Sequence, residues 1–393
     1  MHIIEEPAAL PTRRFALWEL GFRPFYLLAS TFAALSIPLW SLQFSGLLEH
    51  SYLASPVWHA HEMLFGFALA VIVGFLFTAG RNWANQPTPT GALLAALAVL
   101  WIAARVLVLT PFGWAAAAAN VAFPLSAAMA LAVPFYKSRN RRNYFFVGLL
   151  AAMSVASGFV HLAQLGVVDL PSWAGLQAGL DIVLFILAVM GGRVIPMFTN
   201  NGVPGAGATR SPGVERMALG LVLALAAADL VGVKGPSLAL LAGFACIVHA
   251  VRWALWKPWT TLRVPLVWVL HAAYLWVPVH LALRSLAELG LVPLSSATHA
   301  LAVGAAGGLI IGMMTRTARG HTARPLRADR IDTTCYALVL CAALVRVIVP
   351  LVLPAHTVAA IQGSALLWSG GFALYAVRYW PVLTQSRLDG KRG

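Results

Sequence analysis

The chain has 393 residues, of which 60% are hydrophobic and 10% are charged, and its mean hydropathy is +0.80. This composition excludes a string of soluble domains and indicates an integral membrane protein. The net charge of +14 does not indicate a nucleic-acid partner, because the Lys and Arg residues lie in short segments between apolar runs, where they orient membrane helices.

The apolar runs predict an all-α, polytopic transmembrane bundle of about 12 spans, each close to the ~20 residues that cross a bilayer. No soluble domain interrupts them, so residues 1–393 form a single integral membrane domain in this interpretation. The predicted spans are 21–44, 57–79, 91–109, 114–136, 143–166, 173–195, 214–233, 236–256, 262–284, 296–315, 332–351 and 356–380.

The positive charges predict the orientation of this bundle. If the N-terminus is cytoplasmic, most of the 27 Lys and Arg residues fall in cytoplasmic segments, as the positive-inside rule requires. Lys234 and Arg284 are then expected in outer loops, and Arg105 and Arg346 lie within spans. We therefore expect both termini to be cytoplasmic.

Span 57–79 opens with three ionisable groups in four residues, His59, His61 and Glu62. Such groups are costly at membrane depth and usually have a function or a dedicated partner. On a helix His59 shares a face with Glu62 and Met63, whereas His61 points about 200° away from His59. The spacing predicts that the two histidines serve different centres; if the first turn is unwound, both reach one ion. Glu62 is a candidate catalytic residue, acting as a proton relay.

Further histidines fall in the predicted outer half of the bundle, at the outer ends of other spans. Imidazole is a good ligand for iron, copper and zinc, and bundle interiors hold cofactor sites built from facing helices. A hydrogen-bonded histidine at the membrane interface is the alternative for each one. The candidate metal ligands are His59, His61, His161, His280 and His299.

Two arginines, Arg105 and Arg346, lie within spans near their predicted outer ends, where they are costly unless paired or solvated. They are candidate cofactor-binding residues that bind an anion such as a haem propionate, together with His59, His61, His161 and His299. The alternative is pairing with acids of the same leaflet, Glu62, Asp181 or Asp229. Asp181 is in turn a candidate catalytic proton carrier or a member of a structural ion pair.

Span 296–315 carries a face of small residues, Gly304, Gly308 and Gly312, supported by Gly307. This face suits close helix packing and equally suits a flat cofactor that approaches the backbone. The basic segment 316–327 comes directly after it. That segment either binds a phosphate or carboxylate or holds the orientation of the protein.

Several stretches together resemble the NnrS family of bacterial membrane proteins. They are Gly21-Phe22-Arg23-Pro24-Phe25-Tyr26; Trp58-His59-Ala60-His61-Glu62-Met63-Leu64-Phe65-Gly66-Phe67 with Gly74-Phe75-Leu76-Phe77-Thr78-Ala79; Gly191-Gly192-Arg193-Val194-Ile195-Pro196-Met197-Phe198-Thr199-Asn200-Asn201; and the segment from His299 to Gly320-His321-Thr322-Ala323-Arg324-Pro325-Leu326. The resemblance implies a multi-pass protein of the bacterial inner membrane that carries haem and copper and is linked to the nitric oxide response. Ala323 departs from the glycine expected at its position.

The sequence thus favours a haem- and copper-binding membrane protein that acts on nitric oxide (NO) or a metal-nitrosyl species, with its site toward the periplasmic face. Haem–copper oxidoreductase activity, with a separate electron donor, is one interpretation, and whether the chain is an enzyme is left open. The alternatives are a transporter of a metal, haem or a small anion, and a non-catalytic assembly factor for denitrification enzymes.

Overall fold

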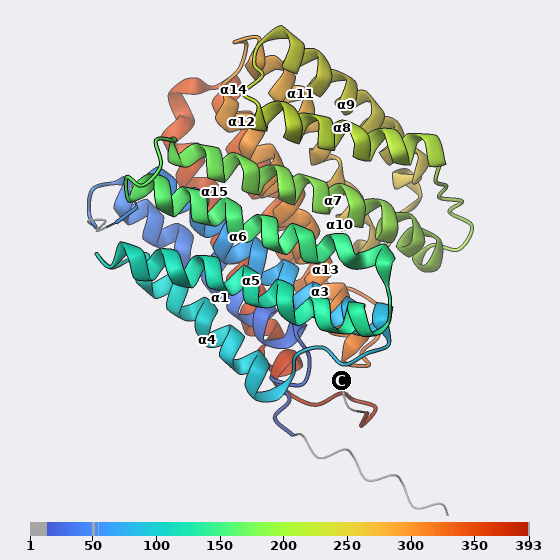
Figure 1. Cartoon of the computed structure of the whole chain (residues 1–393). Helices are drawn as coiled ribbons and strands as arrows, with labels where there is room; N and C mark the ends of the chain where they lie inside the picture. Colours follow the sequence, from blue (N-terminus) through green and yellow to red (C-terminus); the bar gives the residue numbers. More distant parts are fainter. Residues whose placement is uncertain (1–13, 49–51, 54, 392–393) are drawn as a thin grey trace, which may run out of the picture.

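The computed structural model describes residues 14–48, 52–53 and 55–391, and these residues form a bundle of helices (Figure 1). Apart from an isolated bridge between Phe15 and Gln385, the described chain contains no β-pairing, which confirms the all-α prediction. The α-helices are α1 (Phe22–Phe44), α2 (Ser55–His61), α3 (Leu69–Ala84), α4 (Gly91–Leu107), α5 (Gly113–Lys137), α6 (Tyr144–Gln164), α7 (Ser172–Gly202), α8 (Pro212–Leu230), α9 (Pro236–Leu255), α10 (Pro265–Tyr274), α11 (Trp276–Glu288), α12 (Leu294–His299), α13 (Gly308–His321), α14 (Arg330–Val352) and α15 (Thr357–Thr384).

Among the described residues, 10 helices are long and apolar enough to cross a membrane. The helix α4 is apolar but shorter, and α8 carries Glu215, Arg216 and Asp229. A polytopic membrane bundle is therefore confirmed. Several helices continue past the predicted ends of their spans; α7 reaches Gly202 and α13 reaches His321. Hydropathy marks the apolar thickness of a bilayer, whereas a helix continues as long as its polar end is solvated or paired.

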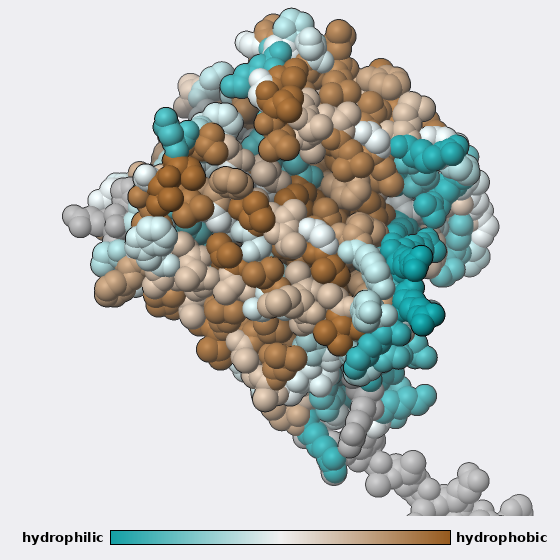
Figure 2. All heavy atoms as spheres, in the orientation of Figure 1, coloured by the Kyte–Doolittle hydropathy of each residue, from teal (hydrophilic) through white to brown (hydrophobic). Residues whose placement is uncertain are grey.

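Both described ends of the chain lie on one face of the bundle, which we call the terminal face. Phe15 pairs with Gln385, and the amide of Gly91, at the start of α4, donates to the carbonyl of Trp18. Hydrophilic residues gather along one edge of the molecule beside a broad hydrophobic surface (Figure 2). We call the half of the bundle farther from this face the opposite half. The compartment that each side faces remains a prediction from the positive charges.

Two helical rods are more buried than the rest, and both carry histidines at their start. For the rod Pro56–Ala84, 78% of the most apolar window is buried, and for Leu294–His321 the share is 72%, against 28% for Pro354–Thr384. A helix that is apolar on all sides belongs inside a bundle. These two rods therefore form the centre around which the others pack.

The small-residue face of the second rod is filled by neighbouring side chains. A Cβ atom built on Gly308 would lie 2.7 Å from the Cβ of Ala273, and one built on Gly312 would lie 2.9 Å from Val269 and Leu270. The backbone of Gly304 likewise abuts the ring of Trp276. Of the two interpretations of this face, close helix packing accounts for it, because the space next to these glycines is occupied.

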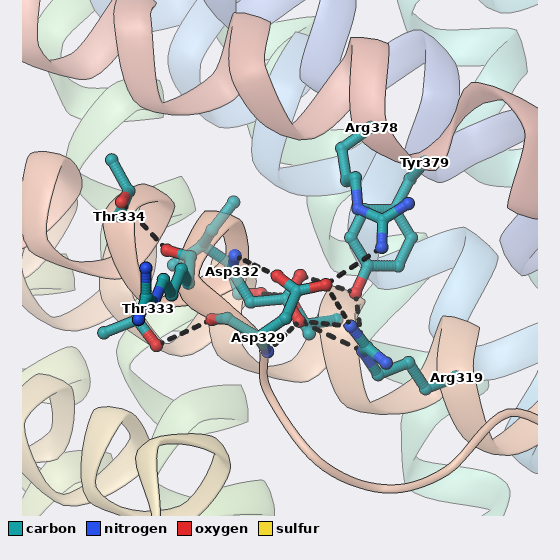
Figure 3. Close-up of polar contacts among 10 residues, drawn as sticks. Arg319, Asp329, Asp332, Thr333, Thr334, Arg378 and Tyr379 are labelled. Atoms are coloured by element: carbon teal, nitrogen blue, oxygen red, sulfur yellow. Dashed lines mark hydrogen bonds and ion pairs between the residues drawn. The ribbon is translucent and has the colours of Figure 1, made fainter.

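An ion cluster on the terminal face joins α13, α14 and α15 (Figure 3). Asp329 and Asp332 form a reciprocal capping box at the start of α14. Arg319 donates to Asp332 at 2.5 Å and to Asp329 at 3.0 Å, and the hydroxyl of Tyr379 donates to Asp332 at 2.9 Å. Arg378 adds a bond to Asp329 at 2.9 Å. Arg319, from the predicted basic segment, therefore binds carboxylates of the chain itself.

Candidate functional site

The two histidine-bearing rods share an uncommon backbone feature. After α2 the chain forms a π-helix, η1 (Glu62–Ala68), and after α12 it forms a second one, η4 (Ala300–Gly307). Each π-helix starts directly after a histidine, His61 in the first rod and His299 in the second. π-Helical turns are rare and are frequent at functional sites. These turns also change the angular offset between residues, and this alters which side chains meet.

A pocket opens between α1, α2, α7, α12, α14 and α15, with an empty volume of about 1050 Å³ that includes the space at its mouth. Its walls are largely apolar, and Leu180, Phe67 and Trp368 are among them. Ligand sites typically combine such walls with a few placed polar groups. Here the ionisable groups are His59, His299 and Arg346.

The two pocket histidines face each other. The ring centroids of His59 and His299 lie 6.3 Å apart, and the ring planes differ by 12°. Trp40 stacks on His59, with ring centroids 4.4 Å apart. The Nδ1 atom of His59 is buried without a partner, and Nδ1 of His299 bonds to the carbonyl of Ser295 at 2.7 Å, which leaves Nε2 of His299 for a ligand.

Arg346 reaches this pocket from α14. Within the part of the chain that the structure describes, no acidic side chain pairs with it, whereas ion pairs are formed by Arg105, Arg252, Arg284 and Arg319. A cation without a carboxylate partner in an apolar setting is costly. The arrangement therefore provides a site for an anionic group of a ligand.

A second histidine pair, His61 and His161, is fully buried between the first rod and α6. The ring centroids lie 4.8 Å apart in an edge-to-face arrangement. Nδ1 of His61 bonds to Glu62 Oε1 at 2.8 Å, and Nδ1 of His161 bonds to the hydroxyl of Tyr52 at 3.0 Å. The Nε2 atoms of both rings are buried and have no hydrogen-bond partner among the residues that the structure describes. We call these two residues the buried pair.

Glu62 and Arg105 form an ion pair beside the buried pair. Arg105 donates to Glu62 Oε1 at 2.6 Å and also bonds to the side-chain oxygen of Asn120 on α5. Both charged groups are buried. For Arg105 the structure thus favours pairing with Glu62, one of the two interpretations of the sequence.

Glu62 corrects one expectation from helical spacing. Its carboxylate contacts His61, whereas the sequence placed Glu62 on the face of His59. The physical reason is the set of partners: Oε1 of Glu62 accepts from Arg105 as well as from its sequence neighbour His61, and Glu62 does not line the pocket of His59. Met63 does line the pocket with His59. His59 and His61 themselves lie on α2 and point to separate groups.

Asp181 lies in a third group, away from both histidine pairs. Arg284 of α11 bonds to Asp229 of α8 and lies 3.7 Å from Asp181 Oδ1, and Gln177 donates to Asp181 at 2.9 Å. The geometry favours the structural ion pair over a proton carrier for Asp181. It also corrects the position of Arg284, which is buried within a helix and not in an outer loop, because two carboxylates compensate its charge.

His280 joins neither histidine pair. Its Nδ1 bonds to the carbonyl of Ala297 at 2.8 Å, and its Nε2 is buried without a partner in the described part of the chain. The structure therefore brings together His59 with His299 and His61 with His161, and it leaves His280 outside both.

Three residues of these groups have no counterpart among the sequence candidates: Tyr52, Asn120 and Trp40. The sequence could have identified Asn120, because it is a lone amide directly after the alanine run 115–119, and polar groups at membrane depth usually have a partner. Nothing in the sequence distinguishes Tyr52 and Trp40, since aromatic residues near the ends of spans are common in any membrane protein.

The sequence matches the family described as NnrS protein over residues 16–387, nearly the whole chain. No curated protein matches it. The chain therefore belongs to the NnrS family, as its motifs predict, and this membership supports a membrane protein of the nitric oxide response.

Proposed function

We propose that this member of the NnrS family is a haem- and copper-binding protein of the bacterial inner membrane that acts on NO or a metal-nitrosyl species. The membership supports the link to NO. The observation that carries the cofactor proposal is the pocket of His59, His299 and Arg346, in which two imidazoles face each other next to a cation that no carboxylate of the described chain pairs.

The pocket fits a haem in three respects. Its walls are apolar, and it opens between several helices. His59 and His299 each keep a ring nitrogen free of protein partners. Arg346 has no acidic partner among the described residues, and a guanidinium binds carboxylates such as haem propionates well.

In this proposal His59 and His299 would hold the iron, and Trp40 fixes the orientation of the His59 ring by stacking on it. A bound haem would supply an iron that binds NO, and NO would take the place of one of the two histidines, because both together leave the iron no free position. Arg346 would bind the propionates. The apolar walls lower the local dielectric constant, which strengthens each of these polar contacts.

The orientation completes the proposal. Both described ends lie on the terminal face together with Arg319 and Arg378 of the ion cluster, and under the positive-inside rule that face is cytoplasmic. The pocket lies in the opposite half, toward the periplasm. If a reaction consumes protons, Glu62 is the acid nearest the buried pair, with one carboxylate oxygen free.

The test is an optical spectrum and haem analysis of the purified full-length protein, before and after addition of NO. A haem band that NO shifts, and that is lost in His299→Ala but kept in His280→Ala, is the expected result. Protein that is folded but holds neither haem nor copper would overturn the proposal. It would leave the transporter and the assembly factor, which flux measurements in proteoliposomes separate.

A further inference from the structure

We propose that His61 and His161 form a metal site of their own, separate from the pocket, and that this site binds Cu(I). Both rings are fully buried, and their Nε2 atoms have no partner among the described residues although the ring centroids lie only 4.8 Å apart. A buried polar atom without a partner is costly. Two of them on neighbouring rings indicate a ligand that accepts both lone pairs. This inference deepens the proposed function, on which its choice of copper rests.

The hydrogen bonds on the far side of each ring are compatible with the tautomer that a metal needs. Oε1 of Glu62 accepts from Arg105 and therefore also accepts from Nδ1 of His61, which leaves the lone pair on Nε2 of that ring. The Tyr52 hydroxyl can donate or accept, so it can accept from Nδ1 of His161 when Nε2 of that ring binds a metal. Metal-binding histidines almost always have such a partner on the other nitrogen, and it orients the ring.

The number and kind of donors favour a monovalent copper ion. Structural zinc takes four ligands and calcium takes six or more oxygens, but no three His, Cys, Asp or Glu side chains of the described chain are grouped as a metal site. Imidazole suits copper, and Cu(I) is stable with two nitrogen donors. The charges of Glu62 and Arg105 compensate each other, so the net charge of the occupied site is the charge of the metal ion. Because the desolvation cost of an ion grows with the square of its charge, a monovalent ion is favoured in this buried site.

The two sites differ in what they expose. The pocket is open and holds Arg346, whereas the buried pair is closed and its charges are paired. A bulky anionic ligand therefore suits the first site and a single ion suits the second.

The test is competition for Cu(I) between the copper-stripped, full-length protein and a colorimetric Cu(I) chelator, under reducing and anaerobic conditions. We expect one tight site in the parent protein. His61→Ala and His161→Ala should each weaken it at least 100-fold. Tyr52→Phe, which removes only the hydroxyl behind His161, should weaken it about 10-fold, as loss of such a partner typically does.

The matched control is His280→Ala. His280 is also buried, with Nδ1 bonded to a carbonyl and Nε2 unpartnered, but it belongs to neither histidine pair. Its substitution should leave Cu(I) affinity unchanged. A parent protein without Cu(I) binding, equal losses in the control, or full affinity in His61→Ala and His161→Ala would each overturn the inference and favour a water molecule between the rings.

A second measurement uses the parent protein alone, so it tests the inference even if the variants do not fold. X-ray absorption of the copper-loaded parent protein should show a few nitrogen neighbours and no sulfur; sulfur neighbours would overturn the assignment. Haem is quantified in the same samples. Copper at the buried pair without haem would contradict the proposed function alone, and haem without copper would contradict this inference alone.

Discussion

Two groups of polar side chains in this protein, one in each half, differ in how their hydrogen bonds are satisfied. In the ion cluster of the terminal face, every carboxylate oxygen of Asp329 and Asp332 accepts a hydrogen bond. In the opposite half, His59, His61 and His161 keep buried ring nitrogens that bond to no described residue. Saturated buried networks specify and stabilise a fold, whereas unsatisfied buried groups need a separate explanation, such as a ligand. We therefore assign stability to the ion cluster and binding to these histidines.

The largest effect that would test this comparison is loss of Arg319. It bonds to both carboxylates of the ion cluster, and Asp332 is fully buried, so Arg319→Leu leaves an uncompensated buried charge. Breaking such a pair costs about 3–5 kcal/mol. Thermal unfolding in detergent should show a large loss of stability, while haem and copper per folded molecule stay constant.

The control for this variant is Arg330→Gln. Arg330 is exposed at the start of α14, and surface changes are usually within about 0.5 kcal/mol. If Arg319→Leu is as stable as this control, the ion cluster does not stabilise the bundle.

Arg105 and Arg346 allow stability and binding to be compared within the opposite half. Arg105→Leu removes the partner of buried Glu62 and should cost about 3–5 kcal/mol. Arg346→Leu removes no ion pair seen in the described chain, so stability should change by less than about 1 kcal/mol, but the haem content should fall. Thermal unfolding and haem analysis of both variants check this. Equal losses of stability, or full haem content in Arg346→Leu, would contradict the roles assigned here.

The smallest expected effect is a pH dependence at Asp329, which caps α14 just outside its membrane span. Burial alone raises the pKa of this carboxyl, but hydrogen bonds and the charges of Arg378 and Arg319 outweigh burial and hold its pKa below the usual range. A lowered folded-state pKa stabilises the protein above the unfolded value of about 3.9, and this contribution is lost as the pH falls through the folded value.

The measurement is thermal unfolding of the parent protein and Asp329→Asn between pH 3 and 7. The asparagine still caps the helix, so the stability difference reports the charge. We expect the difference to be complete at pH 5–7, to shrink as the pH falls below about 3.9, and to be lost only as the pH falls through the folded-state pKa. A difference that does not shrink between pH 5 and pH 3 would show that the cap, and not the ion pair, is the source of the stability.

The sequence predicts the helical bundle well, because an apolar run of membrane length has one stable conformation in lipid. It also identifies the histidines and Arg105 and Arg346, since charged and imidazole groups stand out against apolar runs. The sequence cannot show which of these histidines lie next to each other in the fold. His161, His280 and His299 all end or begin spans in the same half, and only the packing of α6 and α12 against the first rod pairs two of them.

The error at Glu62 has a tertiary cause. Sequence spacing gives the helix face of a residue but not the partner of its side chain, and here Arg105 of α4 binds the carboxylate beside His61. Likewise the partner of Arg284 is not visible in the sequence, because Asp229 is on a helix 55 residues away.

The central claim is that the two histidines of α2 serve two separate sites. The most direct test is haem and copper stoichiometry in His59→Ala and His61→Ala, purified in parallel with their optical spectra. We predict that His59→Ala loses haem and keeps copper, and that His61→Ala loses copper and keeps haem. Identical losses in both variants would show that the two histidines share one site and would contradict this account.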